Sequence, residues 1–296
     1  ERNYERVLSE AKKAFGSAEI FLEKCVDRPR HIEVQVLADE HGNVTHLFER
    51  DCSIQRRHQK LIEIAPSPQL SDEQRAMLGD YAIRAARAVG YQNAGTVEFL
   101  MDGESDFYFM EMNTRLQVEH TVTESITGID IVGEQIRIAS GKPLSFTQAD
   151  VQKRGFAMQF RINAEDPKND FLPSFGRITR YFAPGGPGVR TDAAIYTGYT
   201  IPPYYDSMCA KITVWALSWD ELLKRACRAL HDTGVYGVKT TIPYYLEVLK
   251  VDDFRAGHFD TGFVEQYAQL VNYKTSRPAR ELAAVVAAVV AAHAGY

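Results

Sequence analysis

Paired cysteines, an excess of positive charge and a long apolar run are all missing from this sequence of 296 residues. Its most apolar stretch, residues 282–292, is shorter than the roughly 20 residues that a membrane span needs, so no span is predicted. Its 34 lysines and arginines against 39 aspartates and glutamates give a net charge of −5, which argues against a nucleic-acid partner.

The four cysteines are scattered at Cys25, Cys52, Cys209 and Cys227, and none forms a C-x-x-C pair. This spacing indicates neither a zinc site nor a disulfide framework. Free thiols fit a reducing compartment, so a cytoplasmic location is expected. The charged, helix-like opening does not resemble a signal peptide, and the lack of an initiating methionine suggests a fragment or a processed start.

Hydrophobic periodicity predicts a mixed α+β order of elements and not a strict βαβ repeat. A capping box of Ser71 with Gln74 and the pair Ser218 with Glu221 mark two helix starts. A polar stretch near residues 141–154 suggests a domain boundary. The expected helices cover residues 4–15, 71–89, 131–140 and 242–250 and a segment from 218; the expected strands cover residues 20–22, 31–37, 44–48, 61–64, 94–101, 107–112, 156–163, 177–182 and 210–215.

A row of polar residues alternates with apolar ones after the hairpin between residues 94 and 112. Its members are Glu111, Asn113, Arg115, Gln117 and Glu119. If the segment is extended, all five side chains lie on one face, because successive side chains of a strand point to opposite sides. Such a row is long enough to place a metal site and an acid-base site along one cleft.

Symmetric pairing of this hairpin sets Glu98 opposite Glu111. Directly opposed carboxylates repel each other, because their Cβ atoms lie about 5 Å apart. Hard oxygen ligands with Asn113 nearby suit Mg²⁺, which takes one or two carboxylates and completes its shell with phosphate and water. The alternative is a solvated hairpin face with a chance alternation of charges.

Residues 49–60 concentrate basic side chains at Arg50, Arg56, Arg57, His58 and Lys60. Such a cluster can neutralise phosphates or a small anion. The plainer alternative is a solvated loop that pairs with neighbouring acids, and on the segment alone this alternative is slightly favoured. A nucleic-acid patch is disfavoured by the acidic balance of the chain.

Two further side chains attract attention but have ordinary explanations. His31 opens a strand, where a lone histidine is more often structural than functional. Arg161 lies between Phe160 and Ile162, and an inward arginine usually pairs with a carboxylate, for which Glu165 or Asp166 would serve.

Together these segments resemble the biotin carboxylase family. The resemblance extends from near residue 1 to about residue 265, and the strings at 49–60 and 111–120 are highly specific to that family. The matching stretches are residues 30–39, 49–60, 94–100, 111–120, 161–167, 183–186 and 198–207.

The resemblance implies part of an ATP-grasp fold followed by the biotin carboxylase C-terminal domain. Residues 1–25 would be the remainder of the ATP-grasp lid subdomain, 26–150 the catalytic region, 151–270 the C-terminal domain and 271–296 an alanine-rich helical tail. It also implies that ATP phosphorylates bicarbonate to carboxyphosphate, which releases CO₂ that carboxylates N1 of carrier-bound biotin.

The resemblance also implies roles for individual residues. Glu98, Glu111 and Asn113 would hold Mg²⁺, or Mn²⁺ in its place, with the ATP phosphates. Glu119 would deprotonate bicarbonate. The other implied sites are Lys60, Arg115, Gln117 and the Val118 backbone at bicarbonate, Arg115 also at the biotin enolate, Arg161 at biotin or phosphate, Glu23 and Lys24 at adenine, and His31, Gln55 and His58 at the ribose and phosphates.

The family's N-terminal domain and glycine-rich lid are missing from this sequence, and it has no Met-Lys-Met biotin-attachment motif. The implied partners are therefore that N-terminal domain, a biotin carboxyl carrier on a separate domain or chain, a carboxyltransferase chain and a second copy in a homodimer. The tail resembles that of the biotin carboxylase subunit of two-subunit pyruvate carboxylases, with pyruvate or an acyl-CoA as final acceptor. The rival hypotheses are another ATP-grasp ligase of the carbamoyl-phosphate synthetase type, and a scaffold subunit without catalysis.

Overall fold

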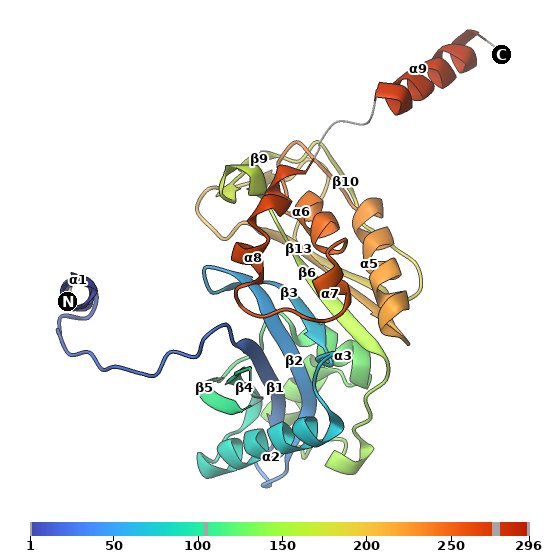
Figure 1. The fold of residues 1–296 in the computed structure, drawn as a ribbon. Coiled ribbons are helices and arrows are strands. Elements are labelled where there is room, and N and C mark those ends of the chain that lie inside the picture. The colour runs from blue at the N-terminus through green and yellow to red at the C-terminus, as the bar shows by residue number, and fades with distance from the viewer. Residues whose placement is uncertain (1, 104–105, 274–278, 295–296) are drawn as a thin grey trace.

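The computed structural model describes residues 2–103, 106–273 and 279–294. Most helices lie against a large sheet, whereas α1 lies apart from it at the end of an extended segment (Figure 1). The α-helices are α1 (Arg2–Phe15), α2 (Asp72–Ala88), α3 (His120–Thr127), α4 (Ile131–Ala139), α5 (Trp219–Asp232), α6 (Ile242–Val248), α7 (Asp252–Arg255), α8 (Phe263–Gln266) and α9 (Ala279–Ala294), with 3₁₀ turns η1 (Gln148–Asp150), η2 (Pro167–Asn169) and η3 (Ala268–Asn272).

One antiparallel sheet of eight strands organises the fold, in the order β11-β13-β6-β3-β2-β1-β4-β5. Three further pairs of short strands, β10 with β14, β12 with β9 and β7 with β8, lie outside it. The strands are β1 (Arg30–Ala38), β2 (Val44–Arg56), β3 (Gln59–Ala65), β4 (Asn93–Met101), β5 (Phe107–Asn113), β6 (Phe156–Asn163), β7 (Glu165–Asp166), β8 (Leu172–Pro173), β9 (Gly176–Arg177), β10 (Arg180–Phe182), β11 (Val189–Ala193), β12 (Thr200–Ile201), β13 (Met208–Ala216) and β14 (Gly234–Tyr236).

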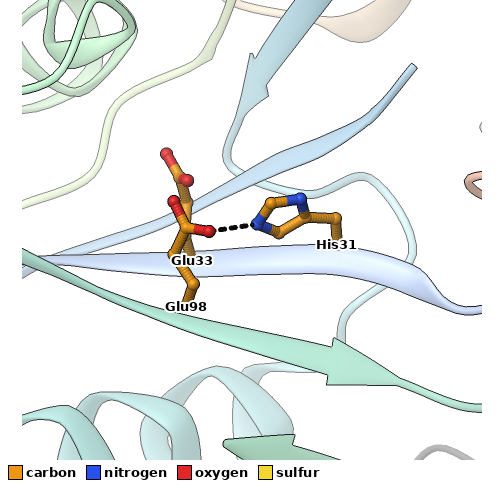
Figure 2. Close-up of side chains that lie close together, drawn as sticks. All are labelled: His31, Glu33 and Glu98. Carbon is orange, nitrogen blue, oxygen red and sulfur yellow. Dashed lines mark hydrogen bonds and ion pairs between the residues drawn. The ribbon is translucent and has the colours of Figure 1, made fainter. Parts of the chain in front are cut away.

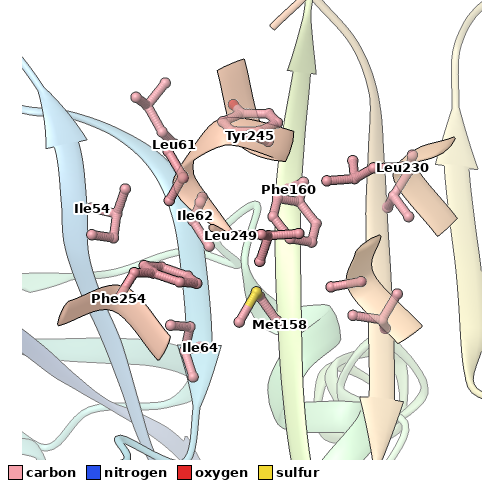
Figure 3. Packing of buried hydrophobic residues seen from close by; sticks show 14 of the residues in the cluster. Ile54, Leu61, Ile62, Ile64, Met158, Phe160, Leu230, Tyr245, Leu249 and Phe254 are labelled. Atoms are coloured by element: carbon pink, nitrogen blue, oxygen red, sulfur yellow. The ribbon is translucent and has the colours of Figure 1, made fainter. Parts of the chain in front are cut away.

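The two faces of the sheet have different chemistry. Around β3, β6 and β13, one face presents Ile62, Ile64, Met158 and Phe160 to helices α5 to α8, and these side chains form one buried cluster (Figure 3). Around β1 and β4, alternate apolar residues pack against α2 in a second cluster. The opposite face carries polar side chains and is covered by α3 where it crosses β3, β6 and β13. The functional site lies on this polar face.

A β-bulge in β3 changes which side chains reach the polar face. Ile54 pairs with Ile62 and Gln55 pairs with Lys60, so Leu61 is an extra residue in the ladder. A bulge of this kind re-aims the side chains that follow it. Lys60 and Glu63 are three positions apart and would lie on opposite faces of a regular strand, but here both contact residues of the polar face.

Most predicted elements are confirmed. Ser71 caps α2 and accepts a hydrogen bond from the Gln74 backbone at 3.2 Å, while the Gln74 side chain accepts one from the Ser71 backbone at 2.9 Å. Ser218 caps α5 through the backbone N–H of Glu221. All four cysteines are free, as expected. The α+β class is confirmed, and the part of the chain with described coordinates has no helix long and apolar enough to cross a membrane.

Several local predictions are wrong. Residues 20–22 form no strand, and the strand expected at 177–182 is split between β9 and β10. The basic segment 49–60 is not a loop, because β2 continues to Arg56 and a tight turn with positive φ at Arg57 and His58 leads directly into β3. The expected pairing with acids does occur, since both Arg56 and Arg57 contact Asp170.

The extended row from Glu111 to Glu119 is also wrong beyond Asn113. The chain leaves the sheet there and turns into α3, with backbone hydrogen bonds from His120 to the Gln117 carbonyl at 3.3 Å and from Val122 to the Glu119 carbonyl at 3.2 Å. Alternation of side chains therefore ends where the strand ends.

The predicted division into domains stays a prediction. The sheet is continuous across the expected boundary near residues 141–154, because β6 pairs directly with β3. The tail forms the expected helix in α9, where the exposed fractions of Val285, Val286, Val289 and Val290 are between 43% and 62%. Part of the expected tail, residues 274–278 and 295–296, lies outside the described residues.

We expect Phe160→Ala to lower the free energy of unfolding by about 3–5 kcal/mol, because it leaves a cavity in the cluster of Figure 3. The Phe160 ring is fully buried and lies 5.4 Å from that of Tyr245. The control Phe21→Ala removes a ring that is 81% exposed and should change stability by less than about 0.5 kcal/mol. Urea denaturation measures both, and equal losses would contradict the assignment of this core.

Candidate active site

A row of charged side chains crosses four neighbouring strands on the polar face. Arg50 of β2 is directly opposite Glu33 of β1, Glu33 is opposite Glu98 of β4, and Glu98 is opposite Glu111 of β5. The predicted register of Glu98 with Glu111 is therefore confirmed. Three carboxylates in adjacent positions repel one another unless cations lie among them.

Lys60 lies at the centre of these acids. Its Nζ donates hydrogen bonds to Glu33 at 2.5 Å, to Glu98 at 2.9 Å and to Glu119 at 2.7 Å. Only 12% of the Lys60 side chain is exposed. Burial alone would lower the pKa of Lys60, but the surrounding carboxylates raise it, so the ammonium stays charged.

Arg50 holds the row from the other side. Its side chain is fully buried and donates to Glu33, to Gln35 at 2.7 Å, to Thr96 at 3.0 Å and to Gln117 at 2.8 Å. Burial alone would raise the pKa of Glu33, but the charges of Arg50 and Lys60 lower it to about 2. Glu33 is therefore an ionised carboxylate with no exposure to solvent.

His31 completes the inner part of the row. Its Nε2 lies 2.9 Å from Glu98 Oε2, and Figure 2 shows His31, Glu33 and Glu98 grouped together on their two strands. Burial raises the pKa of Glu98, but the hydrogen bond with His31 and the charge of Lys60 outweigh it and lower the pKa. These three residues have ligand atoms within 4.8 Å of one another, yet the Lys60 ammonium already lies between the two carboxylates, so a second cation here would be repelled.

Glu119 faces this group from the turn before α3. Its Oε1 accepts the bond from Lys60 and its Oε2 accepts one from Arg161 NH2 at 3.0 Å. The side chain is only 2% exposed, so both cations act on it in a medium of low dielectric constant. This arrangement keeps one buried carboxylate between two fixed positive charges.

The predicted partners of Arg161 are wrong. Its Nε donates to Glu63 of β3, whereas Glu165 accepts from Ser207 and Asn163. The reason is the sheet. β6 lies beside β3, and Glu63 is diagonally adjacent to Arg161 on the same face, one pair along from Gln159.

The outer end of the row fits a divalent cation. Glu33 and Glu98 have Arg50, Lys60 and His31 as partners, but among the described residues Glu111 has no cationic partner and accepts only from Asn113 Nδ2 at 3.0 Å. Opposed carboxylates beside an amide are hard ligands of the kind that Mg²⁺ takes, with substrate phosphate and water in its remaining positions. Glu98, Glu111 and Asn113 would hold it.

The other residues predicted at bicarbonate lie in or beside the turn before α3. The buried Gln117 accepts from Arg50 and donates to Glu98 at 2.8 Å. The Val118 carbonyl accepts from Lys211 Nζ at 2.8 Å. Arg115 is exposed and donates to the Leu116 carbonyl at 3.3 Å, so the structure leaves it outside the charged cluster.

The structure does not bring the predicted nucleotide residues together. Glu23 and Lys24 are exposed in the segment between α1 and β1, where Lys24 Nζ lies 5.7 Å from the centre of the Tyr108 ring. His58 is exposed at the tip of the turn between β2 and β3. Gln55 is buried beside Lys60 in the ladder. Their roles stay predictions.

Sequence reasoning missed three charged residues of the site, Glu33, Glu63 and Lys211. Each interrupts an apolar strand, as Glu33 does between Ile32 and Val34. A charged residue that alternates with buried aliphatic ones is the signal that would have found them, because charges are rarely buried without a partner.

A cavity of about 640 Å³ lies elsewhere, between α5, α6 and α7. It is lined by Cys227, His231 and several basic side chains, but Arg228 is paired with Asp232 at 3.0 Å and Lys250 with Glu247 at 2.7 Å. None of the carboxylates of the row reaches it. The chemistry therefore lies on the polar face of the sheet and not in this cavity.

Comparison with known proteins gives matches over most of the chain. The family model described as "Carbamoyl-phosphate synthase L chain, ATP binding domain" matches residues 1–147, and the model described as "Biotin carboxylase C-terminal domain" matches residues 159–266. The two models together cover the charged row, the turn before α3 and Arg161.

The chain is 50% identical to the 2-oxoglutarate carboxylase small subunit of Hydrogenobacter thermophilus over 99% of this chain and 62% of that protein. It is 52% identical to a subunit of the pyruvate carboxylase of Methanothermobacter thermautotrophicus over 95% and 57%. The biotin carboxylase domain dimer of the Hydrogenobacter enzyme, solved with MgADP, ADP and bicarbonate, superposes with a TM-score of 0.89 at 52% identity over 92% of this chain and 60% of that one. The chain thus spans about three fifths of the length of these relatives.

We expect Glu33→Gln to lower the free energy of unfolding at pH 7 by about 3 kcal/mol, because Lys60 and Arg50 lose a buried counter-charge. The folded pKa of Glu33 lies below its usual 4.5, at about 2, so the stabilisation is complete above pH 4.5 and is lost as pH falls toward 2. The gap between wild type and variant should therefore narrow in that window. Urea denaturation between pH 7 and 3 measures it.

The control for this series is Glu40→Gln, which changes an exposed acid in the turn after β1 and should leave stability within about 0.5 kcal/mol of wild type. A gap for Glu33→Gln that stayed constant over the pH range would contradict the ionised state of Glu33.

Proposed function

The chain belongs to the biotin carboxylase family, and from this premise we propose that the protein containing it carries out ATP- and bicarbonate-dependent carboxylation of carrier-bound biotin. ATP would phosphorylate bicarbonate to carboxyphosphate, which releases CO₂ that adds to N1 of biotin. The observation that carries the proposal is Glu119, a buried carboxylate held between Lys60 and Arg161.

The arrangement suits the first chemical step. A base must take the proton of bicarbonate while its anionic product stays bound, and a fixed carboxylate flanked by cations serves both needs. Glu119 would accept the proton at a carboxylate oxygen, and Lys60 would hold the anion. Gln117 is fixed by Arg50 and Glu98, so it would present a preorganised amide at the same position.

The outer end of the row supports the nucleotide step. Bound Mg²⁺ would offset the charge of the ATP phosphates. Glu98, Glu111 and Asn113 would hold the ion, and His31 would keep Glu98 in position through its 2.9 Å contact. The solved Hydrogenobacter domain, which contains MgADP and bicarbonate, supports this assignment of ligands.

The second step places Arg161 at biotin or the released phosphate, and Arg115 at the biotin enolate. Arg115 is exposed beside the turn before α3, where an incoming carrier would meet it. Glu23 and Lys24 at adenine, and Gln55 and His58 at the ribose and phosphates, complete the assignment. The C-terminal family match at residues 159–266 supports biotin over ammonia as the acceptor.

The proposed partners follow from this chemistry. Carboxylation of a tethered biotin needs a carrier domain or subunit, and transfer onward needs a carboxyltransferase subunit with pyruvate or an acyl-CoA as final acceptor. The relatives are subunits of a 2-oxoglutarate carboxylase and a pyruvate carboxylase, and the solved Hydrogenobacter domain is a dimer, which supports a homodimer here. A cytoplasmic location stays a prediction from the free thiols.

Glu119→Gln should reduce bicarbonate-dependent ATP turnover by about a hundredfold or more, because the amide cannot take a proton. ATP binding should stay near the wild-type level, since the acids proposed to hold Mg²⁺ are unchanged. Phosphate release in the full-length protein measures turnover, with biotin and ammonia compared as acceptors. Wild-type turnover in the variant would remove Glu119 from the role of base, and stimulation by ammonia alone would favour a carbamoyl-phosphate type of ligase.

The matched control is Glu124→Gln, one turn further along α3. Glu124 pairs with Arg190 at 2.6 Å and has no contact with Lys60 or Arg161. It should retain turnover within about a factor of two, since it removes a partly exposed ion pair worth about 1 kcal/mol or less to stability.

Glu111→Gln should raise the Mg²⁺ concentration needed for half-maximal ADP binding by about tenfold, because one charged ligand becomes neutral. Calorimetric titration of ADP at increasing Mg²⁺ measures the effect. The control Asp80→Asn changes an exposed acid of α2 that pairs only with Arg84. An unchanged Mg²⁺ requirement in Glu111→Gln would contradict the metal site.

A further inference from the structure

One buried acid of the polar face has no part in the chemistry described above. Glu63 of β3 has no exposure to solvent, and its nearest cation is Arg161. We propose that Glu63 is a positioning residue that fixes the Arg161 guanidinium for the biotin step. This inference rests on the proposed function and adds a residue that acts through Arg161.

The sheet determines the contact between these two residues. Glu63 is directly opposite Gln159 across β3 and β6, and Arg161 is two positions further along β6 on the same face. Arg161 Nε donates to Glu63 Oε1, while its NH2 group donates to Glu119 Oε2 at 3.0 Å. Arg161 therefore joins two carboxylates that come from different parts of the chain.

Glu63 itself cannot turn away. Its Oε2 accepts from Gln159 Nε2 at 2.9 Å, and Gln159 Oε1 in turn accepts from the hydroxyl of Thr121. Thr121 also lies 2.8 Å from the hydroxyl of Thr213 on β13. All members of this chain of hydrogen bonds other than Arg161 are buried, so each group depends on the next for its partner.

The chain of hydrogen bonds supports both carboxylates at once. Thr121 lies in the first turn of α3, two residues after Glu119. The same network therefore fixes the helix that carries Glu119 and the acid that holds Arg161. A displacement of Glu63 would be transmitted to the distance between Arg161 and Glu119.

The charge of Glu63 decides how Arg161 is shared. A guanidinium has five N–H groups and tends to bind one carboxylate through two of them. With Glu63 holding Nε, Arg161 offers Glu119 a single bond, and its remaining N–H groups lie toward the side where 20% of the side chain is exposed. Without that charge, the guanidinium would close onto Glu119 and turn away from an incoming anion or ureido group.

Glu63→Gln tests this inference, because the amide keeps the size of the side chain and removes its charge. We expect kcat/KM for free biotin to fall about tenfold or more, as misplacement of a catalytic group by about 1 Å can cost a hundredfold. The KM for ATP should stay unchanged, since Glu63 contacts none of Glu98, Glu111 and Asn113. Steady-state kinetics of the full-length protein measure both.

The matched control is Glu49→Gln. Glu49 is also a buried acid of this sheet, and it accepts from Arg75 Nε at 2.9 and 3.0 Å and from the Ser67 backbone at 3.0 Å, away from Arg161. Both variants should lower the melting temperature, but Glu49→Gln should keep the wild-type kcat/KM for biotin. An equal loss of kcat/KM in the two variants would show a merely structural role and overturn the inference.

A double-mutant cycle with Arg161→Met completes the test. If Glu63 acts through Arg161, adding Glu63→Gln to Arg161→Met should cause no further loss of kcat/KM for biotin. Additive losses, or wild-type kinetics in Glu63→Gln alone, would overturn the positioning role while leaving the proposed function intact. A wild-type protein that does not carboxylate biotin would overturn both.

Discussion

The site depends on one electrostatic constraint, which is the neutralisation of acids that the sheet brings together. Glu33, Glu98 and Glu111 lie on adjacent strands, and Glu119 approaches from the turn before α3. At such separations like charges destabilise a sheet, and burial adds a desolvation cost for each ion. Lys60 relieves most of this repulsion because its ammonium contacts three of the four carboxylates at once. The acid without a cation among the described residues, Glu111, lies at the outer end, where a metal and phosphate would meet it.

Irregular pairing makes this arrangement geometrically attainable. The extra residue at Leu61 lets Lys60 reach the polar face together with Glu63, which regular alternation would forbid. A second irregularity between Val34 and Val36 of β1 preserves Glu33 opposite Arg50 although β2 carries one more residue there. The departures from a regular ladder therefore lie beside the charged row, and they determine which side chains the apolar core leaves free for chemistry.

The sequence predicted local features well and distant contacts poorly. Glu98 opposite Glu111 follows from symmetric pairing about a short turn, and the Ser71 cap follows from a spacing of three residues. Partners far apart in the sequence could not be found in this way. Arg161 was paired with neighbouring acids, but its actual partner Glu63 is 98 positions away and lies beside it only because β6 pairs with β3. The turn at residues 114–119 was missed for a related reason, since alternating polarity continues in the sequence after the strand has ended.

The pairing of β3 with β6 is the feature that joins the two halves of the site. The acids of the row come from β1, β4 and β5, whereas Arg161 comes from β6. Lys60 and Glu63 lie on β3 between them, so the register of Glu63 with Gln159 sets how far Arg161 lies from Glu119. A slip of one residue would turn Arg161 toward the apolar core and bring Phe160 onto the polar face. The cluster of Ile62, Ile64, Met158 and Phe160 opposes such a slip, because it would expose their apolar side chains. The hydrophobic face of the sheet thereby fixes the geometry of the charged face.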